Sequence, residues 1–460
     1  MNFFLTVLDR FSQGEEPASM HRLLAICLTG ALFLASVLPA SAVTLLRDPD
    51  IEHALNQLAK PVLTAAGLSP ARVRILVVQD RNMNAFVIDN NHIFIHSGMI
   101  MRLDDAAELQ AVIAHEAAHL AHGHIARRML NARVAKNVAG IGMALAAAAA
   151  ASGSSEAATA LGVGISSSAS RVFMGHTRAE ESSADQSAIR YMARAGVNPN
   201  GLVRVIEIFA GQELISAARQ DPYARTHPMS RDRLRHANAL ADTYTKTNAS
   251  DPKFDYWFSR AKGKLTAFLR SPKWTRSRAG DSAAPDIELM RRAISHHRDS
   301  NTAKAVAAMQ KLLAAHPRDP FYHELYGQIL MESRSTRAAL TAYRNAVNLA
   351  PRDALILGSY GHALLAAGDS ANALKTLEKS RASDGNNARV MRDLGQAYAK
   401  SGQMGMASLV TSERYALQGR MEDAGIHAKR ASDLLPRGST GWQRAQDVLL
   451  AAEAASKKRR

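Results

Sequence analysis

The sequence predicts an α+β, mostly helical protein, in which a domain with a small β-sheet is followed by an all-α solenoid of repeats. Two observations lead to this class. Strand-like segments between residues 73 and 95 lie among segments of helical periodicity. In the second half, small residues recur every 34 positions. The chain of 460 residues is long enough for about two to four domains.

The composition is that of an ordinary globular protein. Hydrophobic residues make up 47% and charged residues 21%, which excludes a disordered or collagen-like chain. The single cysteine, Cys27, lies inside an apolar run near the N-terminus. After that run the chain therefore has no disulfide, no thiolate metal ligand and no cysteine nucleophile.

Residues 1–42 have the pattern of a signal peptide. His21 and Arg22 precede an apolar run over 23–38, and Pro39 with Ala40-Ser41-Ala42 resembles a cleavage site. The run is shorter than the roughly 20 residues of a membrane-spanning helix, which disfavours an uncleaved anchor. We expect a cleaved signal peptide, with Met20 as a candidate for the true start.

Residues 43–270 are predicted to form the first domain. A helix over 50–66 is followed by a strand over 73–78 and a hairpin over 84–95. Asp105 and Glu108 resemble a capping box that begins a helix running to about residue 128. The stretch 134–170 is rich in Ala, Gly and Ser, so it is either a helical hairpin beside the functional site or an element that touches a membrane.

The second half predicts tetratricopeptide (TPR) repeats over residues 286–452. Small residues recur 34 apart in two registers, at Ala305, Ala339, Ala373 and Ala407 and at Gly327, Gly361 and Gly395. This is the period of a two-helix repeat in which small side chains stand where the helices approach closely. A linker is expected over 271–285 and a basic tail over 453–460.

A metal-binding motif lies within the helix that Asp105 begins. In His115-Glu116-Ala117-Ala118-His119 the two histidines are one helical turn apart, so both project from one face and are able to bind one Zn²⁺. Glu116 is placed to take a proton from a water on the metal. The apolar neighbours indicate burial, where a histidine or glutamate without a partner is costly.

A catalytic zinc needs a third protein ligand, and the sequence offers two nearby candidates. His122 lies on the same face of the helix, but one helix seldom supplies three ligands to one metal. Glu181, in a second helical stretch, is the better candidate. Asp185 lies one turn after Glu181 and is placed to orient a ligating histidine.

His-Glu-x-x-His followed by Glu181-x-x-Ala184-Asp185 resembles the zinc metallopeptidases that include the CAAX prenyl proteases and HtpX. The resemblance implies a zincin-like metallopeptidase domain with one Zn²⁺ held by His115, His119 and Glu181. The remaining roles that it implies are Glu116 as general base, Asp185 behind the ligands, an edge strand at Asn84, Ala85 and Phe86 that binds peptide, and a motif at His227 with Arg233 that returns to the active site.

With a signal peptide before the peptidase domain and TPR repeats after it, the resemblance also implies a location and partners. We expect a zinc-dependent endopeptidase of the periplasm that acts on unfolded or misassembled proteins. Its expected role is the quality control and assembly of outer-membrane β-barrel proteins, with the repeats binding partners such as their assembly machinery. The alternative is a chaperone or assembly scaffold whose protease site is latent.

The role of His227 and the meaning of the net charge need separate comment. His227 either occupies the fourth zinc position at rest, as a switch, or stabilises the oxyanion during catalysis. The net charge of +16 does not predict nucleic-acid binding, because no basic motif is interleaved with aromatic residues. The charge favours peripheral contact with anionic membrane surfaces or acidic partners.

Overall fold

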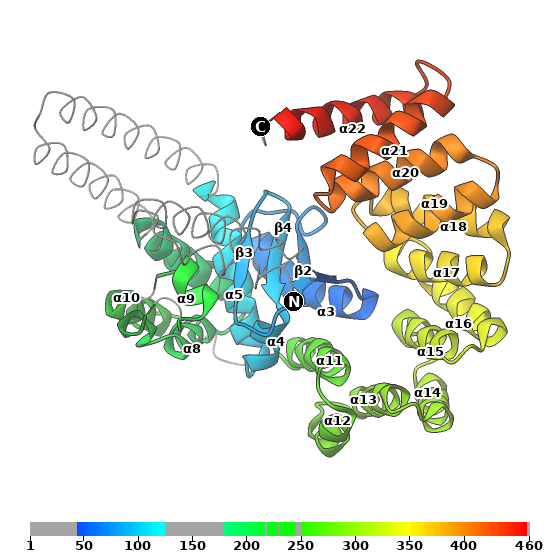
Figure 1. The fold of residues 1–460 in the computed structure, drawn as a ribbon. Helices are drawn as coiled ribbons and strands as arrows, with labels where there is room; N and C mark the ends of the chain where they lie inside the picture. Colours follow the sequence, from blue (N-terminus) through cyan, green and yellow to red (C-terminus); the bar gives the residue numbers. More distant parts are fainter. Residues whose placement is uncertain (1–43, 125–177, 217–218, 229, 245–250, 458–460) are drawn as a thin grey trace, which may run out of the picture. The chain divides into compact units, whose positions relative to one another are not determined.

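A computed structural model describes residues 44–124, 178–216, 219–228, 230–244 and 251–457 (Figure 1). The expected signal peptide, the stretch 134–170 and the last three residues of the expected tail lie outside these ranges. Among the described residues, none of the helices combines the length and the apolar character that crossing a membrane requires.

A four-stranded sheet forms the centre of the first domain, in the order β1-β2-β4-β3. The strands are β1 (Leu45–Leu46), β2 (Arg74–Val78), β3 (Ala85–Val87) and β4 (His92–His96). β2 and β4 are parallel, whereas β3 pairs with β4 antiparallel, as the predicted hairpin requires. Among the described strands β3 therefore lies at an edge of the sheet, where one of its sides pairs with no other described strand.

Helices pack around this sheet and supply most of the first core. They are α3 (Pro49–Ala65), α4 (Ser97–Arg102), α5 (Ala106–Ala121), a helix whose described part covers 178–194, α8 (Asn200–Ile208), η2 (Gln212–Leu214), α9 (Pro222–Thr226), α10 (Arg231–Asp242) and α11 (Pro252–Leu269). α5 is buried along nearly its whole length, and its many alanines allow neighbouring helices to approach closely.

Local interactions explain where α5 begins and where it ends. Asp105 accepts a hydrogen bond from the backbone N–H of Glu108 at 2.9 Å, as the capping box predicts, while the Glu108 side chain accepts from the N–H of Asp104. The helix ends at Ala121 and not near residue 128 as the sequence predicted. Gly123 adopts a φ of +64°, which turns the chain away from the helix axis.

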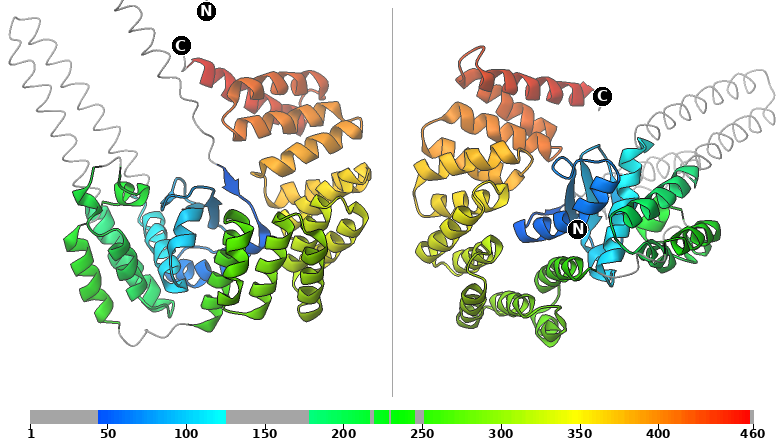
Figure 2. Two further views of the ribbon diagram at one scale, coloured as in Figure 1. Left: turned by 60° about the horizontal axis from the view of Figure 1, so that its bottom comes forward. Right: turned by 180° about the vertical axis from the view of Figure 1, so that it is seen from behind.

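The second half is a stack of helices paired along the chain (Figures 1 and 2). They are α13 (Pro285–Arg298), α14 (Thr302–Ala315), α15 (Pro320–Glu332), α16 (Thr336–Leu349), α17 (Ala354–Ala366), α18 (Ser370–Ser383), α19 (Ala388–Lys400), α20 (Met404–Leu417), α21 (Met421–Leu434) and α22 (Thr440–Lys457). The period of two helices per 34 residues matches the TPR solenoid predicted from sequence. α22 continues into the expected basic tail as far as Lys457.

The stretch 271–285, which we expected to be a linker, contains α12 (Pro272–Ser277) and η4 (Ala279–Asp281), and it buries Thr275 and Ala279. The helix before it, α11, contributes to the cores on both sides. Leu265 is part of the core around the sheet, whereas Ala267 packs with the first repeat.

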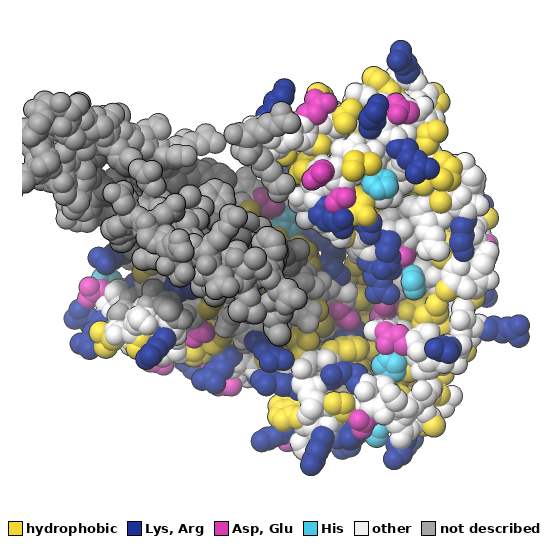
Figure 3. All heavy atoms as spheres, in the orientation of Figure 1, with side chains coloured by type: hydrophobic (Ala, Val, Ile, Leu, Met, Phe, Trp, Pro, Cys, Tyr) yellow, Lys and Arg dark blue, Asp and Glu magenta, His cyan; other side chains and the backbone are white. Residues whose placement is uncertain are grey.

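Buried ion pairs join α11 to its neighbours. Arg260 contacts Asp50 at 2.6 Å and Asp319 at 2.7 Å, so it links α3 to the residue that begins α15. Lys264 contacts Asp48 at 2.9 Å. Elsewhere Lys and Arg side chains are spread over the visible face and mixed with Asp and Glu (Figure 3).

Candidate metal centre

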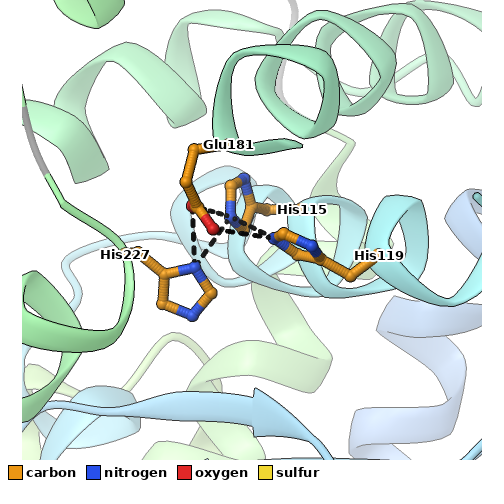
Figure 4. A group of neighbouring side chains, drawn as sticks. All are labelled: His115, His119, Glu181 and His227. Atoms are coloured by element: carbon orange, nitrogen blue, oxygen red, sulfur yellow. Dashed lines mark hydrogen bonds and ion pairs between the residues drawn. The ribbon is translucent and has the colours of Figure 1, made fainter. Parts of the chain in front are cut away.

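Four side chains from three parts of the first domain meet at one point (Figure 4). α5 supplies His115 and His119, whose Nε2 atoms lie 3.1 Å apart. The helix over 178–194 supplies Glu181, and the residue after α9 is His227. One ligand atom from each of the four lies within 4.8 Å of the others, and all four side chains are buried.

The distances agree with a shared metal position. Glu181 Oε2 lies 3.2 Å from His115 Nε2, and its Oε1 lies 3.5 Å from His119 Nε2. His227 Nδ1 lies 2.9 Å from Glu181 Oε2 and 3.2 Å from His115 Nε2. Three imidazoles and one carboxylate form a donor set that suits tetrahedral Zn²⁺.

His122, the other candidate for the third ligand, lies outside this group. Its ring nitrogens are 3.4–3.5 Å from the hydroxyls of Ser183, Ser187 and Tyr191. It therefore faces the helix over 178–194 at a different point from Glu181.

Asp185 and Arg233 support the group from behind. Asp185 Oδ1 lies 3.0 Å from Nδ1 of His115, the nitrogen that faces away from the cluster. Arg233 donates to both oxygens of Asp185, at 2.6 and 2.8 Å, and to the carbonyl of Pro228 at 3.0 Å. One guanidinium thus joins the carboxylate behind His115 to the backbone that follows His227.

The electrostatics keep the carboxylates ionised. Burial alone raises the pKa of Glu181, but His227 and His115 outweigh it and hold that pKa well below its ordinary value. Burial also raises the pKa of Asp185, but Arg233 and His115 lower it by more, so the pKa of Asp185 lies below its ordinary value. Burial lowers the pKa of His115, yet its hydrogen bonds with Asp185 and Glu181 raise it to about 9. Both carboxylates are therefore ionised inside the protein, with the positive charges of His115 and Arg233 beside them.

Glu116 is fully buried beside the cluster. Its Oε1 lies 3.4 Å from Nε2 of His227, while Nδ1 of the same imidazole faces Glu181. The predicted base and the predicted switch residue are therefore in direct contact.

The edge strand lies next to His227. The carbonyl of Asn84 accepts from the N–H of His96, so Asn84 faces β4. Backbone groups alternate in direction along an antiparallel pair, and the N–H and C=O of Ala85 therefore point away from β4. Nε2 of His227 lies 3.4 Å from this carbonyl of Ala85. Phe86, the third predicted residue, faces β4 with its backbone and stacks its ring on Phe94 at 5.3 Å.

α9 is tied to the residues that lead into β3. The N–H of Tyr223 donates to the carbonyl of Met83 at 3.2 Å, and Thr226 Oγ1 donates to Asn84 Oδ1 at 3.4 Å. With the contact between His227 and Ala85, three consecutive residues of the strand segment are joined to α9 and the residue after it.

Two residues of the site were not assigned a role from sequence. The buried ring of Tyr223 packs on the imidazole of His227 with 4.5 Å between ring centroids. Its position four residues before His227 was the only available signal. Nδ1 of His124 lies 2.9 Å from Nδ1 of His119. In the helix that the sequence predicted to continue past residue 121, these two side chains would have pointed to different faces.

Comparison with known proteins gives the following matches. Residues 46–241 match peptidase family M48. The beta-barrel assembly-enhancing protease of Escherichia coli K12 is 23% identical over 409 residues, which cover 86% of this chain and 81% of that protein. A relative from Vibrio cholerae is 24% identical over 217 residues, which cover 47% of this chain and only 44% of that relative. A mitochondrial metalloendopeptidase of Schizosaccharomyces pombe is 24% identical over 44% of this chain and 57% of its own length.

Among solved structures, the TPR protein YrrB is 17% identical and covers 38% of this chain and 91% of its own, with a TM-score of 0.31. MamA is 16% identical and covers 36% of this chain and 95% of its own, with a TM-score of 0.28.

Proposed function

Because the chain carries a domain of peptidase family M48 and is a zinc metalloprotease, we propose that it is an endopeptidase for unfolded or misassembled proteins. The observation that carries this proposal is the buried group of His115, His119, Glu181 and His227 beside an edge strand with an outward-facing carbonyl. The name of the Escherichia coli relative supports a role in the assembly of outer-membrane β-barrel proteins.

We place the mature protein in the periplasm after cleavage of residues 1–42. The support is the order of basic residues, apolar run and Ala40-Ser41-Ala42 in that segment. The repeats are proposed to bind protein partners, among them the machinery that assembles β-barrels, because stacked TPR helices present an extended surface suited to that task.

In the proposed mechanism each residue has a defined task. His115, His119 and Glu181 would hold Zn²⁺, which would act as a Lewis acid toward the scissile carbonyl and lower the pKa of a water molecule. Asp185 fixes the orientation of His115, and Arg233 fixes Asp185. Glu116 takes the proton of the attacking water and gives it to the nitrogen of the leaving amine.

The edge strand would position the substrate. An extended peptide that pairs with β3 needs the outward N–H and C=O groups of Ala85. In the described conformation Nε2 of His227 lies at hydrogen-bonding distance from that carbonyl, while its Nδ1 lies in the ligand cluster. A substrate strand and this position of His227 therefore exclude each other, which supports His227 as a fourth ligand of the resting enzyme.

This contact also favours a second candidate function, a chaperone or assembly scaffold with a largely latent protease. Both functions use the same fold, but only proteolysis needs the base. Glu116→Gln separates them, because glutamine is nearly isosteric with glutamate and does not accept the proton.

We expect purified Glu116→Gln to keep its zinc and its thermal unfolding midpoint and to lose casein cleavage by several orders of magnitude. Wild type with and without a chelator is the matched control for metal dependence. Cleavage by Glu116→Gln within tenfold of wild type would remove Glu116 from the role of base. A wild type that binds zinc but cleaves nothing, with partner binding intact, would favour the scaffold.

A further inference from the structure

The second imidazole of the cluster, His119, has a neighbour that the mechanism above does not use. Nδ1 of His124 lies 2.9 Å from Nδ1 of His119, and the His124 side chain is buried. On its other side, Nε2 of His119 faces His115 at 3.1 Å and Glu181 at 3.5 Å.

The end of α5 explains how two residues five apart in sequence meet. In a continuous helix, residues i and i+5 are about 140° apart around the axis, so their side chains point to different faces. Here the N–H of His122 bonds back to Ala118, and Gly123 takes a left-handed φ of +64°. Apart from Gly123 itself and its two chain neighbours, no atom of the described residues lies within 4 Å of the place that a Cβ on Gly123 would take, so the backbone angle is what favours glycine there. The turn directs His124 back toward His119.

The positions of the protons follow from the metal site. An imidazole that binds a metal through Nε2 uses the lone pair of that nitrogen and carries its proton on Nδ1. Nδ1–H of His119 therefore donates, and Nδ1 of His124 accepts. His124 must then be neutral, with its own proton on Nε2.

The two histidine ligands thus have different supports. His115 has the carboxylate of Asp185 behind it, whereas His119 has a neutral imidazole. A partner on the outer nitrogen fixes the tautomer and the ring orientation of a metal-binding histidine, and its removal costs about 10–100-fold in metal affinity.

We propose that His124 is a positioning residue that accepts a hydrogen bond from His119 and holds this ligand in its zinc-binding tautomer. The proposal rests on zinc binding by the cluster, which is part of the proposed function, and not on the identity of the substrate.

The test compares the zinc affinity of full-length variants by competition with a chromophoric chelator. All variants carry Glu116→Gln, which prevents self-digestion. His124→Leu removes the acceptor. His124→Asn places an amide oxygen close to the position of Nδ1, and His124→Gln places it close to that of Nε2. His96→Leu replaces another buried histidine of the same domain, which lies on β4 outside the ligand cluster.

We expect zinc affinity to fall about 10–100-fold in His124→Leu and His124→Gln and to stay within threefold of the parent in His124→Asn and His96→Leu. If His124→Leu does not fold without zinc, the difference between the Asn and Gln variants decides. Equal affinities in those two variants, or a parent that binds no zinc, would overturn the proposal. Failure of the proposed protease function has another signature, in which the affinities follow this pattern but wild type does not cleave casein.

Discussion

Asp185 shows how much of the site a single carboxylate organises. It contacts His115 on one side and accepts two hydrogen bonds from Arg233 on the other. Arg233 in turn bonds to the backbone at Pro228, so Asp185 links α5 to the segment that carries His227. Loss of Asp185 or of Arg233 would leave the charge of the other residue buried without this partner, which would destabilise the folded protein.

At the residue scale, Glu181→Ala is expected to lower the amount of bound zinc, because it removes the negatively charged ligand and leaves only neutral imidazoles in the cluster. Zinc content per purified chain, with one ion expected for wild type, measures the effect. Glu180→Ala is the matched control, since it removes a buried carboxylate from the same helix but outside the cluster. Full zinc content in Glu181→Ala, with loss in His122→Ala, would identify His122 as the ligand.

His227→Ala distinguishes the two roles that remain for this residue. If His227 is a resting ligand that also contacts the carbonyl of Ala85 on the edge strand, it blocks the site. Its removal is then expected to raise casein cleavage or to cause self-cleavage. As an oxyanion donor, its removal lowers cleavage by about 10²–10³. We expect the first result. The double variant with Glu116→Gln shows whether any new fragments come from self-cleavage.

The residue pattern predicted part of this site and not the rest, for a physical reason. The spacing of His115 and His119 defines their common face without any tertiary information. The contact of His227 with Glu116 and Ala85 depends on how α9 packs against the strand segment, which no local pattern specifies. The partnership of His124 with His119 was missed because the helix was predicted to continue through Gly123.

At the scale of elements, the 34-residue period identified real contact points between helices. A Cβ at Gly327 would lie 2.7 Å from the ring of Tyr343, and one at Gly361 would lie 2.5 Å from Leu377. At Gly395 the nearest atom would be 3.3 Å away, so that contact is looser. The period was therefore most informative in the earlier repeats. The short helix in 272–277 was not foreseen, because a composition rich in Ser, Arg, Lys and Pro also suits a linker.

Gly361→Ala is expected to destabilise the protein by about 1–2 kcal/mol. Alanine gains up to about 1 kcal/mol in helix propensity, but pressing a methyl into the buried Leu377 costs about 1–3 kcal/mol. Gly385→Ala is the control, because the nearest atom to its Cβ would be 3.8 Å away. Urea unfolding measures both, and a Gly361→Ala variant as stable as wild type would contradict the close approach of α17 and α18.

At the scale of the whole molecule, Glu324 makes stability depend on pH. Burial raises its pKa to about 7 despite the nearby Lys264, and Oε2 has no hydrogen-bond partner among the described residues. The folded protein therefore keeps a proton on Glu324 that the unfolded chain loses near its ordinary pKa of 4.5. The folded state loses stability relative to the unfolded state as pH rises from about 4.5 to 7.

Glu324→Gln removes this cost while keeping an acceptor for Ser359. We expect the variant to be about 1–3 kcal/mol more stable than wild type at pH 8 and nearly equal to it at pH 5, as judged by urea unfolding. Glu332→Gln serves as the control, because this side chain on the same helix is half exposed and paired with His297. A gain that is equal at both pH values would show that ionisation of Glu324 is not its cause.

The sharing of α11 between two cores has a consequence for the order of events during synthesis. The chain is made from its amino end, so Asp50 leaves the ribosome 210 residues before its partner Arg260. Until α11 emerges, α3 lacks both its apolar neighbour and the cations that neutralise Asp48 and Asp50. A nascent chain that stops before Pro252 thus lacks the helix that completes the core around the sheet. The first repeat helix, α13, follows α11 in the order of synthesis, with α12 and η4 between them.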